Sequence, residues 1–221
     1  MIKTIDIQSG ETAGLYQYLS AAVTPRPIAF VSTIDAEGNE NLSPFSFFNV
    51  FSINPPILVF SPVRRVRNNT SKHTLDNVNQ VKECVISLVT DEIAQQVSLA
   101  SSDFNKKTNE FEKAGFTAIK SDLISPSRIK ESPINFECKV NEVITLGKEG
   151  GAGSLVLCEV LKIHIDDSIL DENNAIDPFK LNIVSRLGAN WYGKTNRDSL
   201  YEIAKPISRM GMGIDNLPEE I

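Results

Sequence analysis

Short runs of β-branched and aromatic residues, separated by turn residues, recur along the first part of the chain. Residues 28–34 form the clearest run, and residues 35–39 follow with turn chemistry that includes a glycine. The two segments predict a β-hairpin whose second arm runs on through residues 41–52. The Asn-Pro-Pro segment at 54–56 ends that arm and marks the entrance of another buried strand at 57–61, because proline cannot donate to a strand ladder.

A mixed pattern follows, in which helical and strand periods alternate. Residues 74–82 predict a helix with Leu75 and Val78 on one face and Thr74 as its N-cap. Residues 84–90 read as a strand. A second helix is expected to open at 90–92, where acidic residues favour a helix start, and to bury one face over the next two turns. A third, short helix should end at Gly115, a suitable C-terminal cap.

After Ser132 the apolar residues recur at every second position, as in a β-strand. Apolar residues alternate with polar ones over residues 134–140, residues 147–153 are glycine-rich, and residues 155–165 form a long apolar run. These segments predict a second long hairpin. Residues 166–221 are loop-rich with weak periodicity, and we expect them to form an extension that packs on the main body of the domain or on a partner subunit.

Length and charge narrow the classes of protein. A chain of 221 residues fits one domain, which we assign to residues 1–221. The net charge of −6 argues against binding to nucleic acid or to an anionic membrane surface, which both require an excess of Lys and Arg. The first residues lack the basic and apolar regions of a signal peptide, and no run has the length of a membrane helix. We therefore expect a cytoplasmic protein.

The cysteines and histidines do not suggest a metal site or a disulfide framework. Cys84, Cys138 and Cys158 lie far apart in apolar runs, which is typical of reduced core cysteines. His73 and His164 are the two histidines of the chain, and His164 is expected to lie on a strand face without a chemical role. We predict no metal.

The most informative feature is a long window without acidic residues. Residues 41–75 contain no Asp or Glu, yet they include four basic residues, so this window is locally positive in an acidic protein. It also contains many Ser, Thr and Asn side chains and a predicted helix start at Lys72, His73 and Thr74. Such a start favours an anion because its N–H groups are unpaired and the helix dipole is positive there. The alternative is that Thr74 only caps the helix and that the arginines form a solvated loop.

Catalytic motifs are missing from the sequence. It has no GxGxxG, GxxxxGK[ST], HExxH or GxSxG segment, and no catalytic dyad is evident. We therefore predict no catalytic side chain and expect a cofactor to supply the reactivity. Four phenylalanines between 45 and 51 could line a flat aromatic ligand or could belong to the core.

Eight short segments, in order and spacing, resemble the flavin reductase-like, FMN-binding split β-barrel family. The resemblance implies a mainly β fold, a six-stranded antiparallel split barrel of Greek-key type with added helices. It also implies a homodimer with FMN near the subunit interface. The segments are RPIAFVST (26–33), the DxEG turn, NLSPFSFFNVF (41–51), NPP (54–56), KHT (72–74), NEFEKAGF (109–116), ESPINFECK (131–139) and RLGANWY (186–192).

The resemblance also implies a set of flavin-binding positions. One group would border the flavin, a second would hold the phosphate and ribityl end, and Arg26 is a further candidate contact. Relatives often carry Asp where His73 stands and Gly where Ala189 stands. A loop with Arg186, Trp191 and Tyr192 either approaches the flavin pocket or is purely structural. The first group is Asn41, Leu42, Ser43, Ser46 and Asn49, and the second is Ser61, Lys72, His73 and Thr74.

The family resemblance implies an NAD(P)H-dependent flavin reductase, which takes hydride from NADH or NADPH as co-substrate and passes electrons to an acceptor. Free flavin, oxygen or a partner monooxygenase are possible acceptors. Hydride transfer to flavin requires stacking and electrostatic support, with no obligatory acid or base. The alternatives are a flavoredoxin-type electron carrier that nicotinamide does not reduce, and an FMN-binding module without turnover. The related pyridoxamine-phosphate oxidases have a substrate-binding signature that is not evident here.

Overall fold

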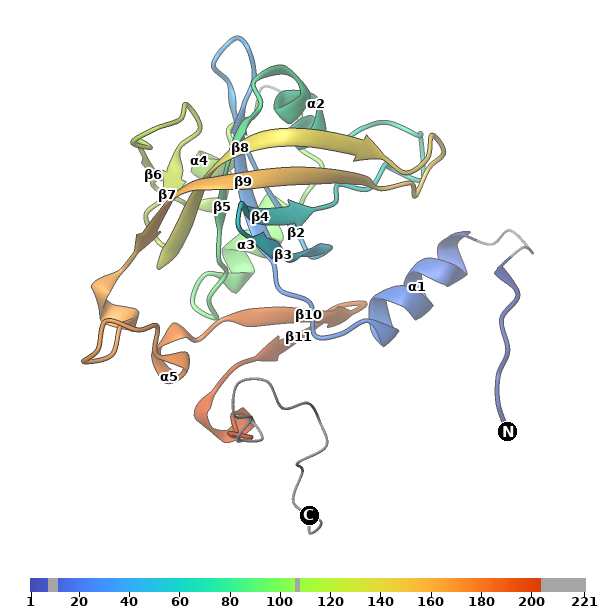
Figure 1. The fold of residues 1–221 in the computed structure, drawn as a ribbon. Helices are drawn as coiled ribbons and strands as arrows, with labels where there is room; N and C mark the ends of the chain where they lie inside the picture. Colours follow the sequence, from blue (N-terminus) through green and yellow to red (C-terminus); the bar gives the residue numbers. More distant parts are fainter. Residues whose placement is uncertain (8–11, 106–107, 204–221) are drawn as a thin grey trace.

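Three antiparallel hairpins build the main sheet of the protein, and a single strand, β5, joins two of them. The computed structural model describes residues 1–7, 12–105 and 108–203, and within these ranges the main sheet has the strand order β2-β1-β5-β8-β9-β4-β3 (Figure 1). All neighbouring strands run antiparallel. The strands are β1 (Ala29–Ile34), β2 (Glu40–Phe45), β3 (Phe48–Ile53), β4 (Pro56–Phe60), β5 (Glu83–Ser87), β8 (Ile134–Thr145) and β9 (Ser154–Ile165).

The two edge strands of this sheet follow one another directly in the sequence. β2 ends at Phe45 and β3 begins at Phe48, so the two edges cannot be more than roughly 11 Å apart at that point. The sheet must therefore curl round on itself, and it stays open between β2 and β3 because these strands do not pair. This is a split barrel, and the mainly β prediction is confirmed. The predicted count of six strands is wrong, since the main sheet has seven within the described residues.

The extra strand arises where the sequence pattern is ambiguous. Residues 41–52 were expected to form one continuous arm, but the chain leaves β2 after Phe45 and crosses to the opposite edge of the sheet. Phe47, just before β3, continues the pairing of β3 with β4, because its carbonyl accepts the N–H of Ser61 at 2.8 Å. Pro56 opens β4 as predicted, and Asn54 and Pro55 form the tight connection between β3 and β4.

Both faces of the central strands are buried, in two separate cores. Along β1, Val31 points into the barrel interior with Phe60 and Ile86, whereas Phe30 points outward. Phe30 and Phe116 meet edge to face, with ring centroids 5.0 Å apart. The interior also holds the three cysteines, which are fully buried and unpaired, as the sequence predicted. These are Cys84, Cys138 and Cys158.

Helices cover the outer core and one mouth of the barrel. α3 and α4 pack on β2, and α2 packs on β1 and β2. Two helix starts differ from the prediction. Lys72, not Thr74, occupies the N-cap position of α2. α3 begins at Ala94 and not at residues 90–92, because Thr90 forms a β-bridge with Ile183. Gly115 ends α4 in the left-handed region as predicted. These helices are α2 (His73–Gln80), α3 (Ala94–Ala100) and α4 (Glu110–Ala114).

Elements at both ends of the chain were not predicted. An N-terminal helix, α1 (Thr12–Ala22), lies beside a hairpin made of β10 (Val184–Gly188) and β11 (Trp191–Lys194) (Figure 1). Gly188 has a φ of +101°, and a Cβ there would lie 3.0 Å from the Cα of Ala21, so this position requires glycine. Residues 204–221 of the predicted extension lie outside the described residues. The remaining elements are β6 (Ala118–Ile119), β7 (Arg128–Ile129), α5 (Pro178–Leu181) and two short 3₁₀ turns, Asp167–Ile169 and Arg197–Ser199.

None of the helices within the described ranges has the length and apolar character needed to cross a bilayer.

Candidate functional site

Two adjoining hollows lie where the barrel is split. The larger has a volume of about 220 Å³ and is lined by the connection from β2 to β3, by Tyr16 of α1 and by the residues after β4. The smaller lies against the first turn of α2 and the segment after α3. Ser43 and Lys72 belong to the walls of both. The two hollows therefore form one site with a wide end and a narrow end.

The larger hollow combines apolar surface with hydroxyl groups. Pro44, Phe45 and Phe47 supply flat apolar surface, and the hydroxyl-bearing residues Ser46 and Ser61 lie in the same wall. Ser61 is closely confined, since a Cβ on Gly153 would lie 2.6 Å from the Ser61 Oγ. A flat aromatic ligand would find stacking surface and hydrogen-bonding groups here.

The smaller hollow is polar and lies at a helix N-terminus. Lys72, His73 and Thr74 from the start of α2 line it together with Asn41 and Ser43 of β2. Partial burial lowers the pKa of the Lys72 ammonium group, although the nearby Asp103 carboxylate acts in the opposite direction. An ammonium group beside a helix start is suited to an anion such as a phosphate. The sequence predicted this combination.

A buried carboxylate orders the floor of this narrow end. Glu110 of α4 accepts the Asn41 amide at 2.9 Å and the Leu42 backbone N–H at 3.2 Å, and the Thr74 hydroxyl donates to Asn41 at 2.8 Å. Burial raises the pKa of Glu110 above its ordinary value, and these hydrogen bonds oppose the rise. Glu110 thus holds Asn41 and Thr74 in place. No local signal marks Glu110 as a site residue, although it lies within the segment NEFEKAGF.

The loop after β4 contains Arg64, Arg65 and Arg67 and is called the basic loop; it folds back onto the narrow end, where Arg65 lines the hollow. Arg65 donates to the Asp103 Oδ1 at 2.9 Å, and Arg67 contacts Oδ2 of the same carboxylate. The Lys72 Nζ lies 3.7 Å from the Asp103 Oδ1. The hydrogen bond from Arg65 holds the pKa of Asp103 below its ordinary value. Arg64 instead contacts Asn69 within the loop. Asp103 was missed because no local sequence signal points to it.

Arg26 contacts the site through another residue. Its guanidinium is buried, and burial lowers its pKa. Nη1 donates to the backbone oxygens of Ser20 and Val23 near the end of α1, and Nε lies 3.4 Å from the Ser46 Oγ. In this position Arg26 joins α1 to the wall of the larger hollow.

Three other predictions fall at the edge of the site or away from it. Leu42 points into the outer core and is fully buried, so only its backbone faces the Glu110 network. Asn49 is exposed on β3, where its side chain accepts the Val50 N–H at 2.8 Å. The hairpin with Trp191 lines neither hollow. Ala189 in this hairpin has a φ of +43°, in the left-handed region that favours glycine.

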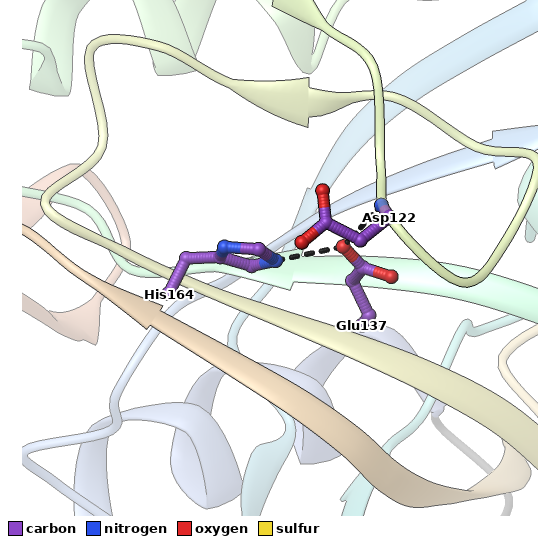
Figure 2. Close-up of side chains that lie close together, drawn as sticks. All are labelled: Asp122, Glu137 and His164. Atoms are coloured by element: carbon purple, nitrogen blue, oxygen red, sulfur yellow. Dashed lines mark hydrogen bonds and ion pairs between the residues drawn. The ribbon is translucent and has the colours of Figure 1, made fainter.

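A second polar cluster lies outside the hollows. Figure 2 shows His164 on β9 reaching Glu137 on β8, with Asp122 approaching from the β6–β7 connection; the His164 Nε2 and the Glu137 Oε1 are 2.7 Å apart. His164 therefore has a partner that the sequence did not predict. Arg128 lies 3.9 Å from Glu137, and Lys162 lies 2.7 Å from Asp122.

The contacts of this cluster bear on whether it is a metal site or a network of ion pairs. Three potential metal ligands, Asp122, Glu137 and His164, come within 4.8 Å of one another. Both oxygens of Glu137, however, already accept backbone N–H groups, from Asp122 and Leu123, each at 2.8 Å. Arg128 and Lys162 supply the positive charge that a metal ion would otherwise bring. The cluster is an ion-pair network that fastens the β6–β7 connection to the β8–β9 hairpin.

The fold is a split barrel with a polar and aromatic site at its opening, and the comparisons with known proteins identify the family. The model of the flavin reductase like domain matches residues 21–181. The protein therefore belongs to the flavin reductase-like family. An uncharacterized protein of Aquifex aeolicus is 39% identical over 186 residues, which cover 83% of this chain and 92% of the relative.

Two solved structures are similar over nearly their whole length. Nitrilotriacetate monooxygenase component B from Bacillus cereus superimposes with a TM-score of 0.83 at 26% identity, covering 93% of this chain and 99% of that chain. The 2-nitrobenzoate 2-nitroreductase NbaA from Pseudomonas fluorescens has a TM-score of 0.81 at 27% identity, covering 95% of this chain and all of that one (100%). The fold and the arrangement of elements are thus shared with redox proteins.

Proposed function

We propose that this protein binds FMN in the two hollows and acts as an NAD(P)H-dependent flavin reductase. The observation that carries the proposal is the continuity of the site: Ser43 and Lys72 join a wide apolar end to a narrow cationic end. A molecule with a flat ring system and a terminal phosphate matches both ends. When bound, FMN would supply the ring that accepts hydride from NADH or NADPH.

The residues of the chain have distinct parts in this proposal. Lys72 and the first turn of α2 hold the phosphate, with His73 and Thr74 beside it. Ser61 and Ser46 offer hydrogen bonds along the ribityl chain and the ring edge, and Phe47 excludes water from one side of the ring. Arg26, whose Nε lies 3.4 Å from the Ser46 Oγ in the wall of the larger hollow, would bring positive charge to the ring end, which favours a reduced, anionic flavin. No side chain needs to donate or remove a proton for hydride transfer, which agrees with the missing catalytic dyad.

For the electron acceptor we propose a kind of molecule and not one particular compound. The two similar solved proteins are named as a monooxygenase component and a nitroreductase. We propose that the electrons pass to free flavin, a partner monooxygenase, oxygen or another electron acceptor. A flavoredoxin-type carrier, or an FMN-binding module that nicotinamide does not reduce, is the alternative. The three buried, unpaired cysteines fit a reducing compartment, and we propose the cytoplasm.

Visible absorbance of the FMN-reconstituted and desalted protein tests the proposal. The flavin should remain bound through the column, and its blue absorbance band should bleach when NADH or NADPH is added without oxygen. The nucleotide that bleaches the band faster is the preferred co-substrate. Retained flavin that stays oxidised with both nucleotides would support the carrier alternative, and loss of all flavin on the column would contradict tight binding of FMN.

We also propose that the protein is a homodimer, with the edge strand β3 in the interface. Val50, Phe51 and Ile53 are 52%, 69% and 82% exposed on this strand, an apolar patch on an unpaired sheet edge. A second copy of the chain is the proposed occupant. Phe51→Glu should shift the dimer to monomer in light-scattering measurements at micromolar concentration. Ile176→Glu, at an exposed apolar position in another part of the chain, should not; a monomeric wild type would overturn the proposal.

A further inference from the structure

Three basic side chains, two of which line the narrow hollow, converge on one carboxylate of the chain itself. Asp103 lies just after α3, in the wall of the hollow that also contains Lys72 and Arg65. It forms ion pairs with Arg65 at 2.9 Å, with Arg67, and with Lys72 at 3.7 Å. The proposed phosphate site therefore already has an anion of the protein within reach of the cations that a phosphate would use.

The other acid of this hollow is engaged differently. Glu110 also lines the hollow, but its two oxygens accept the Asn41 amide and the Leu42 N–H. Asp103 is thus the carboxylate that balances the basic loop. Its side chain is 35% exposed, so it can turn towards solvent without burying an unpaired charge.

We infer that Asp103 is an internal competitor for the phosphate of the flavin and thereby sets how tightly the flavin is held. This inference rests on the proposed function. A phosphate monoester carries close to two negative charges at neutral pH, whereas the carboxylate carries one. The phosphate therefore takes over Lys72 and Arg65, and Asp103 moves away from them. Part of the binding free energy is spent on separating these ion pairs, which makes the flavin easier to release.

Asp103→Asn tests the inference, because asparagine keeps the shape of the side chain and removes its charge. Binding of FMN and of riboflavin, which lacks the phosphate, is measured by quenching of flavin fluorescence. The variant should bind FMN about tenfold more tightly and release it more slowly, with riboflavin affinity unchanged. Asp103→Ser, which also removes the charge, should give the same result and guards against misfolding of one variant.

Asp91→Asn is the matched control. Asp91 precedes α3 and pairs with Lys194 at 2.7 Å, outside both hollows, so its loss changes the net charge equally. FMN affinity should not change in this variant. Unchanged or weaker FMN binding in both Asp103 variants would overturn the inference, since Asp103 would then be neutral or would orient Arg65 for the ligand. A wild-type protein that binds neither FMN nor riboflavin would instead reject the proposed function.

Discussion

Lys72→Ala is expected to weaken FMN binding by about 1.5 to 3 kcal/mol, which is roughly a 10- to 150-fold rise in Kd. Lys72 is a flexible cation in the walls of both hollows and precedes the first turn of α2. Its ammonium group is partly buried, so solvent screens its attraction for a phosphate less than it would at an exposed site. Titration of the variant with FMN measures the effect directly.

Two comparisons make this experiment specific. Riboflavin affinity should change little in Lys72→Ala, because the removed charge faces the phosphate end. Lys139→Ala removes an exposed lysine from β8, outside both hollows, and should leave FMN affinity unchanged. Equal FMN affinity in wild type and in a folded Lys72→Ala protein would contradict the assignment of the phosphate site.

Glu137→Gln is expected to lower the free energy of unfolding by about 3 kcal/mol at neutral pH. Glu137 is fully buried and accepts two backbone N–H groups as well as His164. A glutamine has one acceptor oxygen, so at least one buried N–H would face an amide NH₂ group. The substitution also removes the negative charge that balances Arg128. Urea unfolding followed by circular dichroism gives the difference.

The pH dependence of this effect has a definite sign. Burial by itself would raise the pKa of Glu137, but the Asp122 and Leu123 amides, together with His164, leave that pKa below its ordinary value. The stabilisation is therefore complete above the pKa of an unfolded glutamate, near about 4.3, and is lost as the pH falls through the lower folded value. The stability gap between wild type and Glu137→Gln should accordingly narrow in acid.

Glu142→Gln on the same strand is the control for the Glu137 variant. Glu142 is exposed, and its replacement should change stability by less than about 0.5 kcal/mol. A Glu137→Gln protein as stable as the wild type at pH 7 would show that the network contributes nothing to the fold. A gap that widens in acid would contradict the assigned direction of the pKa shift.

The local elements were predictable because their signals lie within a few residues. The turn after β1, the glycine-rich turn between β8 and β9, and the cap at Gly115 all depend on short-range chemistry. Helix α1 was not predicted, since Tyr16 and Leu19 remain exposed and, among the residues whose burial is described, none of α1 belongs to either hydrophobic core. The β10–β11 hairpin was missed because both strands are short and β11 is mostly exposed, so its residues show no clear alternation of buried and exposed positions.

Part of the site was also visible in the sequence. The acid-free window contains most of the residues that line the two hollows, from Asn41 to Thr74, because these belong to one continuous stretch of chain. Thr74 was assigned to the wrong partner: a hydroxyl near a helix start favours capping in general, but here Asn41 is close enough to accept its hydrogen bond. The local sequence pattern cannot distinguish a hydroxyl that caps the helix from one that donates to a side chain on a neighbouring strand.

The sequence by itself determined the strand-rich class, the basic character of the site and the segments that build it, since these depend on residue type and short spacing. The tertiary structure alone decided that the chain leaves β2 at Phe45 and crosses the opening of the barrel. It also brought Glu110 to Asn41, 69 residues away, and Asp103 to Arg65, 38 residues away. These contacts arise when the sheet closes and α3 and α4 pack on its outer face, and no periodicity along the chain encodes that closure.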